Sequence, residues 1–341
     1  MLKHFISSLK DKLRKKLIVT YDDYWMHISY KNKLLITRDL RKRYYLRYKH
    51  LFGNYKNIVI FSSNIGEVYV LLKYFVPQLI SQNKDTLFVF TRKSQIQIVE
   101  MFGIALPMVF IPDLVVERFP TRFSVKQKDF LVLFPCKYYD NLESEILMRR
   151  RNYIQGMEQV LGLRASKDIF AQLSVRKSDE KFVNEFLSQN GLCDQKFVFI
   201  LPEAFTCEDL SFSEVTEIVS HCTALGYSCI VNKIGNPYLF KLENIREVYL
   251  NIAQTYALAT RASLIIGVKS GMLELLTETG VNTVLIPKAF KNRSNFRKLS
   301  VEDDIFGFSI LHLPLHYKAM EMTDVAHIDF NSLLTNSNER N

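Results

Sequence analysis

The sequence has few of the patterns that mark a secreted, membrane-spanning or metal-binding protein. No apolar run approaches the roughly 18–20 residues that cross a bilayer, and charged residues fill the N-terminus where a signal peptide would carry its apolar segment. The cysteines are five in number, with no CxxC pair and no zinc-ligand spacing: Cys136, Cys193, Cys207, Cys222 and Cys229. An odd, scattered set indicates reduced thiols rather than a disulfide framework. We therefore expect a cytoplasmic protein, soluble or peripheral to a membrane.

Several ligand-binding signatures are absent as well. The chain contains no GxxxxGK[ST] loop, no GxGxxG at its first strand and no DxD pair, which excludes a Walker loop and the dinucleotide fingerprint and leaves no obvious metal-holding pair. What the chain does contain is 341 residues, 48% of them hydrophobic and 13% aromatic. That is enough material for two packed domains, and it excludes global disorder.

Positive charge is concentrated in one segment. Residues 1–57 carry 15 Lys or Arg and 4 Asp or Glu, whereas the remaining chain carries 30 and 31. Residues 2–13 have the spacing of a basic amphipathic helix, and residues 38–50 interleave tyrosines with basic residues. Residues 1–50 are therefore predicted to lie on an anionic membrane surface. A structural helix and a nucleic-acid-binding segment are the alternatives, but a nucleic-acid partner is not expected because the body is nearly neutral.

From residue 57 onward, short apolar runs alternate with segments of helical periodicity. Such alternation predicts an α/β fold with parallel strands. The predicted strands are these: 57–63, 86–91, 107–112, 130–135, 196–202, 227–232, 263–268 and 282–287. Residues 141–190 are expected to be a mostly helical bridge between the two sets of strands, and a further short strand is expected in FGFSILHL after residue 305.

This pattern predicts two Rossmann-like lobes with a deep cleft between them. We expect a basic helical arm over 1–55, an acceptor-side lobe over 56–190, a nucleotide-sugar-binding lobe over 191–300, and a segment over 301–341 that packs back on the N-terminal lobe. Ligands of open α/β sheets bind beyond the carboxyl ends of the strands. The turns that follow the strands are therefore the places to look for functional residues.

The turn after the first strand is the first candidate. It carries Ser63, Asn64, Gly66 and Glu67. A glycine there lets the backbone approach a ligand, and Glu67 on the first helical turn faces the expected cleft, where a carboxylate could serve as a general base. The alternative is ordinary helix chemistry, since an acidic residue in a first turn is stabilised by the helix dipole.

The turn after the strand at 263–268 is the second candidate. Lys269, with the amides of Ser270 and Gly271, could meet a diphosphate, and Glu274 could accept hydrogen bonds from a sugar hydroxyl. The alternative is that Ser270 and Glu274 only cap a helix. A third turn, after the strand at 196–202, brings Glu203 and Thr206 to the same cleft or is a plain loop.

These segments, in this order, resemble GT-B fold glycosyltransferases. The similarity is to the ADP-heptose lipopolysaccharide heptosyltransferases and to related bacterial surface-polysaccharide glycosyltransferases. The family turn Ser-Ser-x-Gly-Asp-Val, whose Asp is the expected base, is similar to residues 62–68, which have one extra residue and Glu67 in place of Asp. The family turn Gly-Val-Asp-Thr-Gly-Leu-x-His-Leu is similar to residues 267–275, with Lys269 for Asp and Glu274 for His. A related Arg-Ser-Gly-Leu-Cys-Asp-Leu-Leu version matches residues 269–276 more closely.

The resemblance implies sugar transfer from a nucleotide-sugar donor to a glycan or lipid-linked acceptor. It implies Glu67 as the base, inversion at the anomeric carbon, and no cofactor or obligatory metal. Two alternatives stay open. A nucleotide-sugar epimerase of the same fold would need more acid/base residues than the chain offers, because His221 falls within a helical segment and His312 and His316 fall in the C-terminal segment. A catalytically decayed scaffold protein is the other alternative.

Overall fold

The computed structural model describes residues 46, 54–55, 57–61, 64–82, 85–105, 107–111, 132–133, 154–155, 157–158, 163–166, 173–204, 207–233, 245–286, 288, 317–319 and 328–335. Nearly all of the basic arm predicted over 1–55 lies outside these residues, as do the strand predicted in FGFSILHL and the candidate residues Ser63 and Thr206. The boundaries given above for the domains stay predictions.

The first sheet has four parallel strands in the order β3-β2-β1-β4. Its strands are β1 (Asn57–Phe61), β2 (Thr86–Phe90), β3 (Met108–Phe110) and β4 (Val132–Leu133). In register, Ile58 is opposite Leu87 on one side and Val132 on the other. The apolar sequence of β2 is buried at every position, as expected for a strand inside a parallel sheet.

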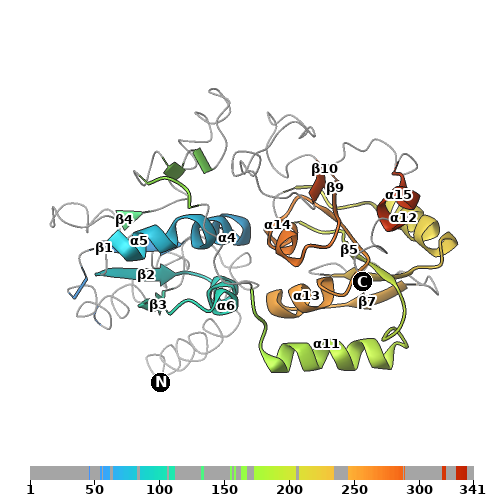
Figure 1. The fold of residues 1–341 in the computed structure, drawn as a ribbon, viewed down its shortest axis with the longest axis horizontal. Coiled ribbons are helices and arrows are strands. Elements are labelled where there is room, and N and C mark those ends of the chain that lie inside the picture. The colour runs from blue at the N-terminus through green and yellow to red at the C-terminus, as the bar shows by residue number, and fades with distance from the viewer. Residues whose placement is uncertain are drawn as a thin grey trace, which may run out of the picture.

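The second sheet has six parallel strands in the order β10-β9-β8-β5-β6-β7. They are β5 (Phe197–Leu201), β6 (Ser228–Asn232), β7 (Ile245–Val248), β8 (Leu264–Val268), β9 (Thr283–Ile286) and β10 (Tyr317–Ala319). Numbered from β5, this is the 3-2-1-4-5-6 order of the doubly wound fold. The two parallel sheets confirm the predicted α/β class (Figure 1).

Helices connect the strands in both lobes. Those of the first lobe are α4 (Ile65–Tyr74), α5 (Val76–Gln82) and α6 (Lys93–Phe102). The later ones are α11 (Lys177–Gln189), α12 (Phe212–Ala224), α13 (Ile252–Ala259), α14 (Gly271–Leu276), the 3-10 helix η2 (Thr277–Thr279) and α15 (Phe330–Thr335). Local signals fix several ends: Ser211 and Glu214 form a capping box on α12, and Gly103 ends α6 with a φ of 64°.

One predicted helix is divided in two. The segment VYVLLKYFVPQLI predicts a single helix, but α4 ends at Tyr74 and α5 begins at Val76. Pro77 is the physical reason, because proline has no backbone N–H and its ring clashes with the carbonyl four residues earlier. In the first turn of α5, the missing N–H costs nothing.

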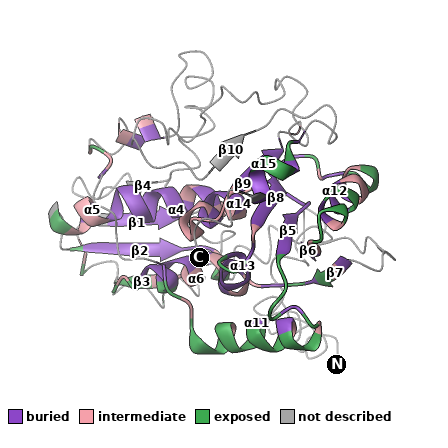
Figure 2. Cartoon of the chain, turned by 45° about the vertical axis from the view of Figure 1, so that its right-hand side comes forward, coloured by how far each residue is buried: buried purple, intermediate pink, exposed green. Residues whose placement is uncertain are grey.

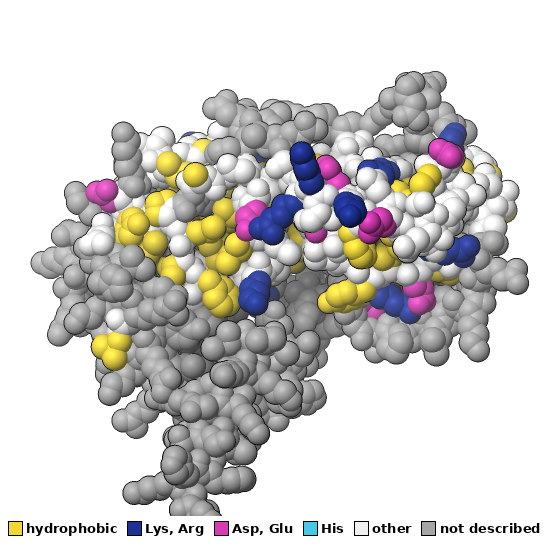
Figure 3. Space-filling model, turned by 90° about the horizontal axis from the view of Figure 1, so that it is seen from below, with side chains coloured by type: hydrophobic (Ala, Val, Ile, Leu, Met, Phe, Trp, Pro, Cys, Tyr) yellow, Lys and Arg dark blue, Asp and Glu magenta, His cyan; other side chains and the backbone are white. Residues whose placement is uncertain are grey.

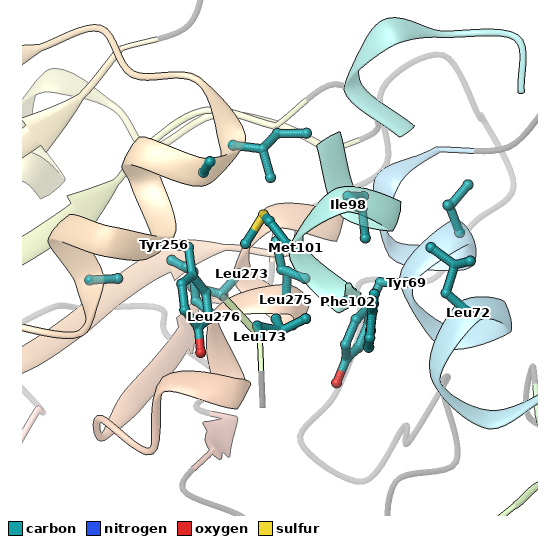
Figure 4. Packing of buried hydrophobic residues seen from close by; sticks show 14 of the residues in the cluster. Tyr69, Leu72, Ile98, Met101, Phe102, Leu173, Tyr256, Leu273, Leu275 and Leu276 are labelled. Atoms are coloured by element: carbon teal, nitrogen blue, oxygen red, sulfur yellow. The ribbon is translucent and has the colours of Figure 1, made fainter. Parts of the chain in front are cut away.

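The two lobes share one hydrophobic core. Helix α14 packs on α4, and α13 packs on α6. Figure 4 shows the result: side chains of α4, α6, α13 and α14 lie together in one cluster, with Met101 near Leu273 and Tyr69 beside Phe102. A second cluster lies on the other face of the second sheet, because Phe199 of β5 belongs to the first cluster whereas its neighbours Val198 and Ile200 belong to the second. The strands β1, β2, β5 and β8 and the helices α4, α13 and α14 are accordingly mostly buried (Figure 2).

The described part of the C-terminal segment belongs to the second lobe. Strand β10 pairs with β9, and α15 contributes Phe330, Leu333 and Leu334 to the second cluster, where Phe330 stacks on His221 at 5.2 Å between ring centroids. Residues 317–319 and 328–335 thus lie on the second lobe, and the expectation that the segment 301–341 packs back on the N-terminal lobe stays a prediction. The hydrophobic side chains of α15 therefore pack on the same face of the second sheet as those of α12.

Two surface properties bear on the predicted membrane contact. Among the described residues, no helix is long and apolar enough to cross a bilayer. On the face seen from below in Figure 3, acidic and basic side chains are interspersed rather than gathered by sign. The described surface in that view thus matches the nearly neutral balance of the sequence after residue 57.

Candidate functional site

The first turn of α4 carries the acceptor-side candidates. Asn64 occupies the N-cap position in an extended conformation, but its side chain makes no cap hydrogen bond. Its Oδ1 instead accepts a hydrogen bond from Arg92 Nη1 at 3.2 Å. Gly66 is buried, and Glu67 is half-buried on the same turn. Strand β1 therefore delivers Glu67 to the carboxyl end of the first sheet, as predicted.

The first turn of α14 carries the donor-side candidates. Lys269 follows β8 directly, and Ser270 caps the helix by accepting a hydrogen bond from Leu273 N at 3.2 Å. The capping interpretation is thus correct for Ser270. It does not account for Glu274, which lies four residues after the cap with its side chain buried at 3% exposure.

The two turns touch each other across the lobes. A Cβ added to Gly271 would lie 2.9 Å from Gly66 Cα and 3.0 Å from the carbonyl carbon of Ile65. A Cβ added to Gly66 would lie 3.0 Å from Gly271 Cα and would collide with the Glu274 carboxylate. Only glycine at both positions allows so close an approach. The contact brings Glu67 of one lobe together with Lys269 and Glu274 of the other.

Both turns lie at topological switch points. In the first sheet, β1 stands between β2 and β4; in the second, β5 stands between β6 and β8. The loops that leave neighbouring strands at such a point diverge to opposite faces and leave a binding position between them. In this chain two switch points meet, one from each lobe. No cleft is defined between them by the described residues, and the predicted cleft stays a prediction.

The charges of the site are two carboxylates and two cations. Lys269 Nζ lies 4.0 Å from Glu274 Oε1. Burial raises the pKa of Glu274 to about 8; the Lys269 charge opposes this rise and the nearby Glu67 charge adds to it. Burial also raises the pKa of Glu67, while backbone hydrogen bonds and the charges of Lys269 and Arg92 act to lower it. The site therefore favours fewer than two negative charges.

Arg92 is a site residue that the sequence analysis does not single out. It follows β2 and occupies the N-cap position of α6, where it reaches Asn64. Its charge acts on Glu67. Its position could have identified it from the sequence, since a basic residue directly after a buried strand falls at the same sheet edge as Glu67. A parallel sheet brings such positions together.

Glu203, the described candidate from the turn after β5, lies on a loop next to these residues. Glu203 is buried at 8% exposure just after β5. Its loop adjoins the second turn, because the Cys207 thiol donates to the Lys269 carbonyl oxygen at 3.1 Å. Among the described candidates, the contact between the two turns brings together Asn64, Gly66, Glu67, Lys269, Ser270, Gly271 and Glu274, and Glu203 lies on the adjoining loop. Across the described residues, no group of three or more His, Cys, Asp or Glu side chains could hold a metal ion.

Comparisons with known proteins support the fold. No family model matches the chain, and no curated protein matches it. A solved structure of a glycosyl transferase family 9 protein from Veillonella parvula is 16% identical, covers 80% of this chain and 87% of its own, and has a TM-score of 0.50. The ADP-heptose lipopolysaccharide heptosyltransferase II of E. coli is 14% identical, covers 83% and 99%, and has a TM-score of 0.49. The resemblance stated from the sequence is confirmed at the level of the fold.

Proposed function

We propose that this protein is a glycosyltransferase that moves a sugar from a nucleotide-sugar donor to a glycan or lipid-linked acceptor in bacterial surface-polysaccharide synthesis, either lipopolysaccharide or capsule. The meeting of two switch-point turns, one from each lobe, carries the proposal. A transferase must hold donor and acceptor against each other, and binding one substrate on each lobe achieves this. The shared fold supports the same function.

Glu67 is the proposed general base. It takes the proton of the acceptor hydroxyl as that oxygen bonds to the anomeric carbon, while the bond from this carbon to the nucleotide phosphate breaks and its electron pair leaves with the nucleotide. Attack opposite the leaving group inverts the anomeric carbon. This role requires Glu67 to be ionised, and the neighbouring Lys269 and Arg92 charges favour that state.

Lys269 is the proposed partner of the donor diphosphate. Its ammonium group lies at the switch point of the second sheet and offsets the negative charge that develops on the leaving nucleotide, so the reaction needs no obligatory metal. Ser270 uses its oxygen as an acceptor in the helix cap, which leaves its hydroxyl proton to donate to phosphate. Glu274 and Glu203 are proposed to contact the sugar or nucleoside, with Thr206 beside them in the sequence.

A thermal-shift panel of UDP, GDP, ADP and CMP with their sugars tests the donor site. One nucleotide class should raise the melting temperature of the wild type and lose this effect in Lys269→Ala. Lys177→Ala is the matched control, because Lys177 is an exposed lysine on α11, which packs on α13, and it should respond like the wild type. If no nucleotide stabilises the protein, the donor assignment is wrong and the decayed-scaffold alternative gains weight.

Transfer assays with the identified donor then test the base. Glu67→Gln should abolish most transfer while leaving the donor-induced thermal shift in place. Glu180→Gln, at an exposed acid on α11, is the control for loss of a carboxylate. Near-full transfer by a folded Glu67→Gln variant would refute the assignment. Conversion of the nucleotide sugar without any acceptor would identify an epimerase instead.

The basic N-terminal residues are proposed to bring the site to a membrane-bound acceptor. Residues 1–50 carry the basic helical pattern, and an acceptor on a lipid carrier would be found at the cytoplasmic face of the membrane. A variant lacking residues 1–17 should sediment less with anionic liposomes than the full chain. Equal sedimentation of the two proteins would contradict this part of the proposal.

A further inference from the structure

The helices that follow the two proposed substrate turns are joined at two places. Their first turns touch where Gly66 of α4 meets Gly271 of α14. Seven residues after each glycine, Lys73 of α4 forms an ion pair with Glu278 of η2, which directly follows α14. Seven residues are about two helical turns, or about 10 Å. Two contacts separated by this length can fix both the distance and the angle between α4 and α14.

Glu278 is held by side chains from two helices. Its Oε1 accepts hydrogen bonds from Lys73 Nζ and from the Tyr69 hydroxyl, both on α4. Lys73 Nζ also lies 3.5 Å from the Tyr69 hydroxyl oxygen and 5.3 Å from the centre of the Tyr74 ring. From α13, the Tyr256 hydroxyl donates to the Glu278 carbonyl oxygen at 3.5 Å. The segment that follows α14 is thereby tied to α4 of the other lobe and to α13 of its own.

Stability alone does not explain this ion pair. Its side chains are 7% and 21% exposed, and taking two charges out of water costs roughly as much free energy as their attraction provides. The cluster around the pair is apolar and already holds the lobes together. Apolar contacts have no preferred direction, whereas the hydrogen bonds of Glu278 require their donors at defined positions. The core therefore supplies the attraction between the lobes, and the ion pair supplies a defined arrangement.

We propose that Lys73, Tyr69 and Glu278 form an interlobe clamp that positions the site: with the glycine contact, it holds the lobes in one fixed arrangement before any substrate binds. The inference rests on the proposed function, because fixing α4 against α14 fixes Glu67, the proposed base, against Lys269, the proposed partner of the donor diphosphate. The clamp residues act through these two side chains and not on the substrate. Transfer then proceeds without a hinge closure of the lobes.

Distance measurements between the lobes test the fixed arrangement without any substrate. Spin labels at Ser81→Cys on α5 and Ser220→Cys on α12 report on the first and second lobe, since both serines are exposed. Cys193, which is exposed, and Cys136 are replaced by serine in this background. Pulsed electron resonance should give one narrow distance distribution that added nucleotide does not move. Two populations in the free protein, or a shift with nucleotide, would overturn the proposal.

Removing the ion pair in the same background tests the clamp itself. Lys73→Met combined with Glu278→Gln leaves neither charge unpaired, so this variant should fold. Its distance distribution should broaden, because the helices can pivot about the glycine contact. The control, Lys181→Met with Glu185→Gln, removes an exposed ion pair on α11 and should keep the narrow distribution. An equally narrow distribution in the Lys73 and Glu278 variant would show that the apolar core alone sets the arrangement, and the clamp would be rejected.

Transfer kinetics give the functional readout. With the donor found by thermal shift, the kcat of the Lys73→Met and Glu278→Gln double variant should fall about tenfold. Its nucleotide affinity should be unchanged, because the turn at Lys269 is intact. A merely structural pair would lower the melting temperature and leave the kcat of folded molecules as it is, so an unchanged kcat refutes positioning. If no nucleotide binds, the proposed function fails, while the distance measurements still decide the clamp.

Discussion

Replacing Gly271 with alanine tests the direct contact between the lobes. The new Cβ would lie 2.9 Å from Gly66 Cα and 3.0 Å from the Ile65 carbonyl carbon, whereas carbon atoms pack well at about 3.5–4.0 Å. Both obstacles are backbone atoms, so no change of rotamer relieves them. The helix starts must separate by about 1 Å, and we expect the free energy of unfolding to fall by about 1–3 kcal/mol, as for overpacked cores.

The same displacement should also lower the rate of sugar transfer. It moves Lys269 away from Glu67, and a misplacement of about 1 Å can cost about 100-fold in rate. Denaturant unfolding measures the stability, and the transfer assay measures the rate. Gly103→Ala is the control, because Gly103 has a φ of 64° with nothing within 4 Å of an added Cβ. It should lose about 1–2 kcal/mol to backbone strain alone and keep its rate. A Gly271→Ala variant with wild-type stability would refute the reasoning.

Three further predictions concern stability. Lys73 and Glu278 form an ion pair across the lobes, with side chains 7% and 21% exposed. Lys73→Met should therefore lower the free energy of unfolding by about 3–5 kcal/mol, because it leaves the Glu278 charge without its partner. The double variant with Glu278→Gln should lose less, and a double-mutant cycle measured by urea unfolding checks both values. The folded state keeps the Glu274 proton up to a pKa of about 8, whereas the unfolded chain releases it near 4.5. Unfolding free energy should therefore fall by up to about 5 kcal/mol as pH rises across that range, and Glu274→Gln should flatten the curve. Ser270→Ala should cost about 1 kcal/mol in thermal unfolding through the lost cap.

The sequence predicts the strands well where they are buried and apolar. Strands β2, β5 and β8 lie within the segments expected from their apolar runs. Strand β7, with the sequence IREV, is not predicted. It lies at the edge of its sheet and buries only its first and last residues, so it has no continuous apolar run to detect.

The candidate site could be predicted in its parts but not in its assembly. Turn position and residue type are local properties, and they point to Glu67 and Lys269. The contact of Gly66 with Gly271 joins residues more than 200 positions apart, and no local pattern records such a pairing. The environment of Glu274 follows from that contact, which is why its burial against Gly66 is absent from the sequence prediction. Arg92 is the one component that the rule for strand ends could have supplied.

The hydrophobic core that runs from α4 and α6 into α13 and α14 also limits how such a chain can be recombined. Exchanging one lobe for that of a distant relative would pair surfaces that have not been matched to each other, at the glycine contact and at the buried Lys73–Glu278 pair alike. Altering the loops after β5 and β8, which leaves these contacts in place, is therefore expected to disturb the fold less than transplanting a whole lobe.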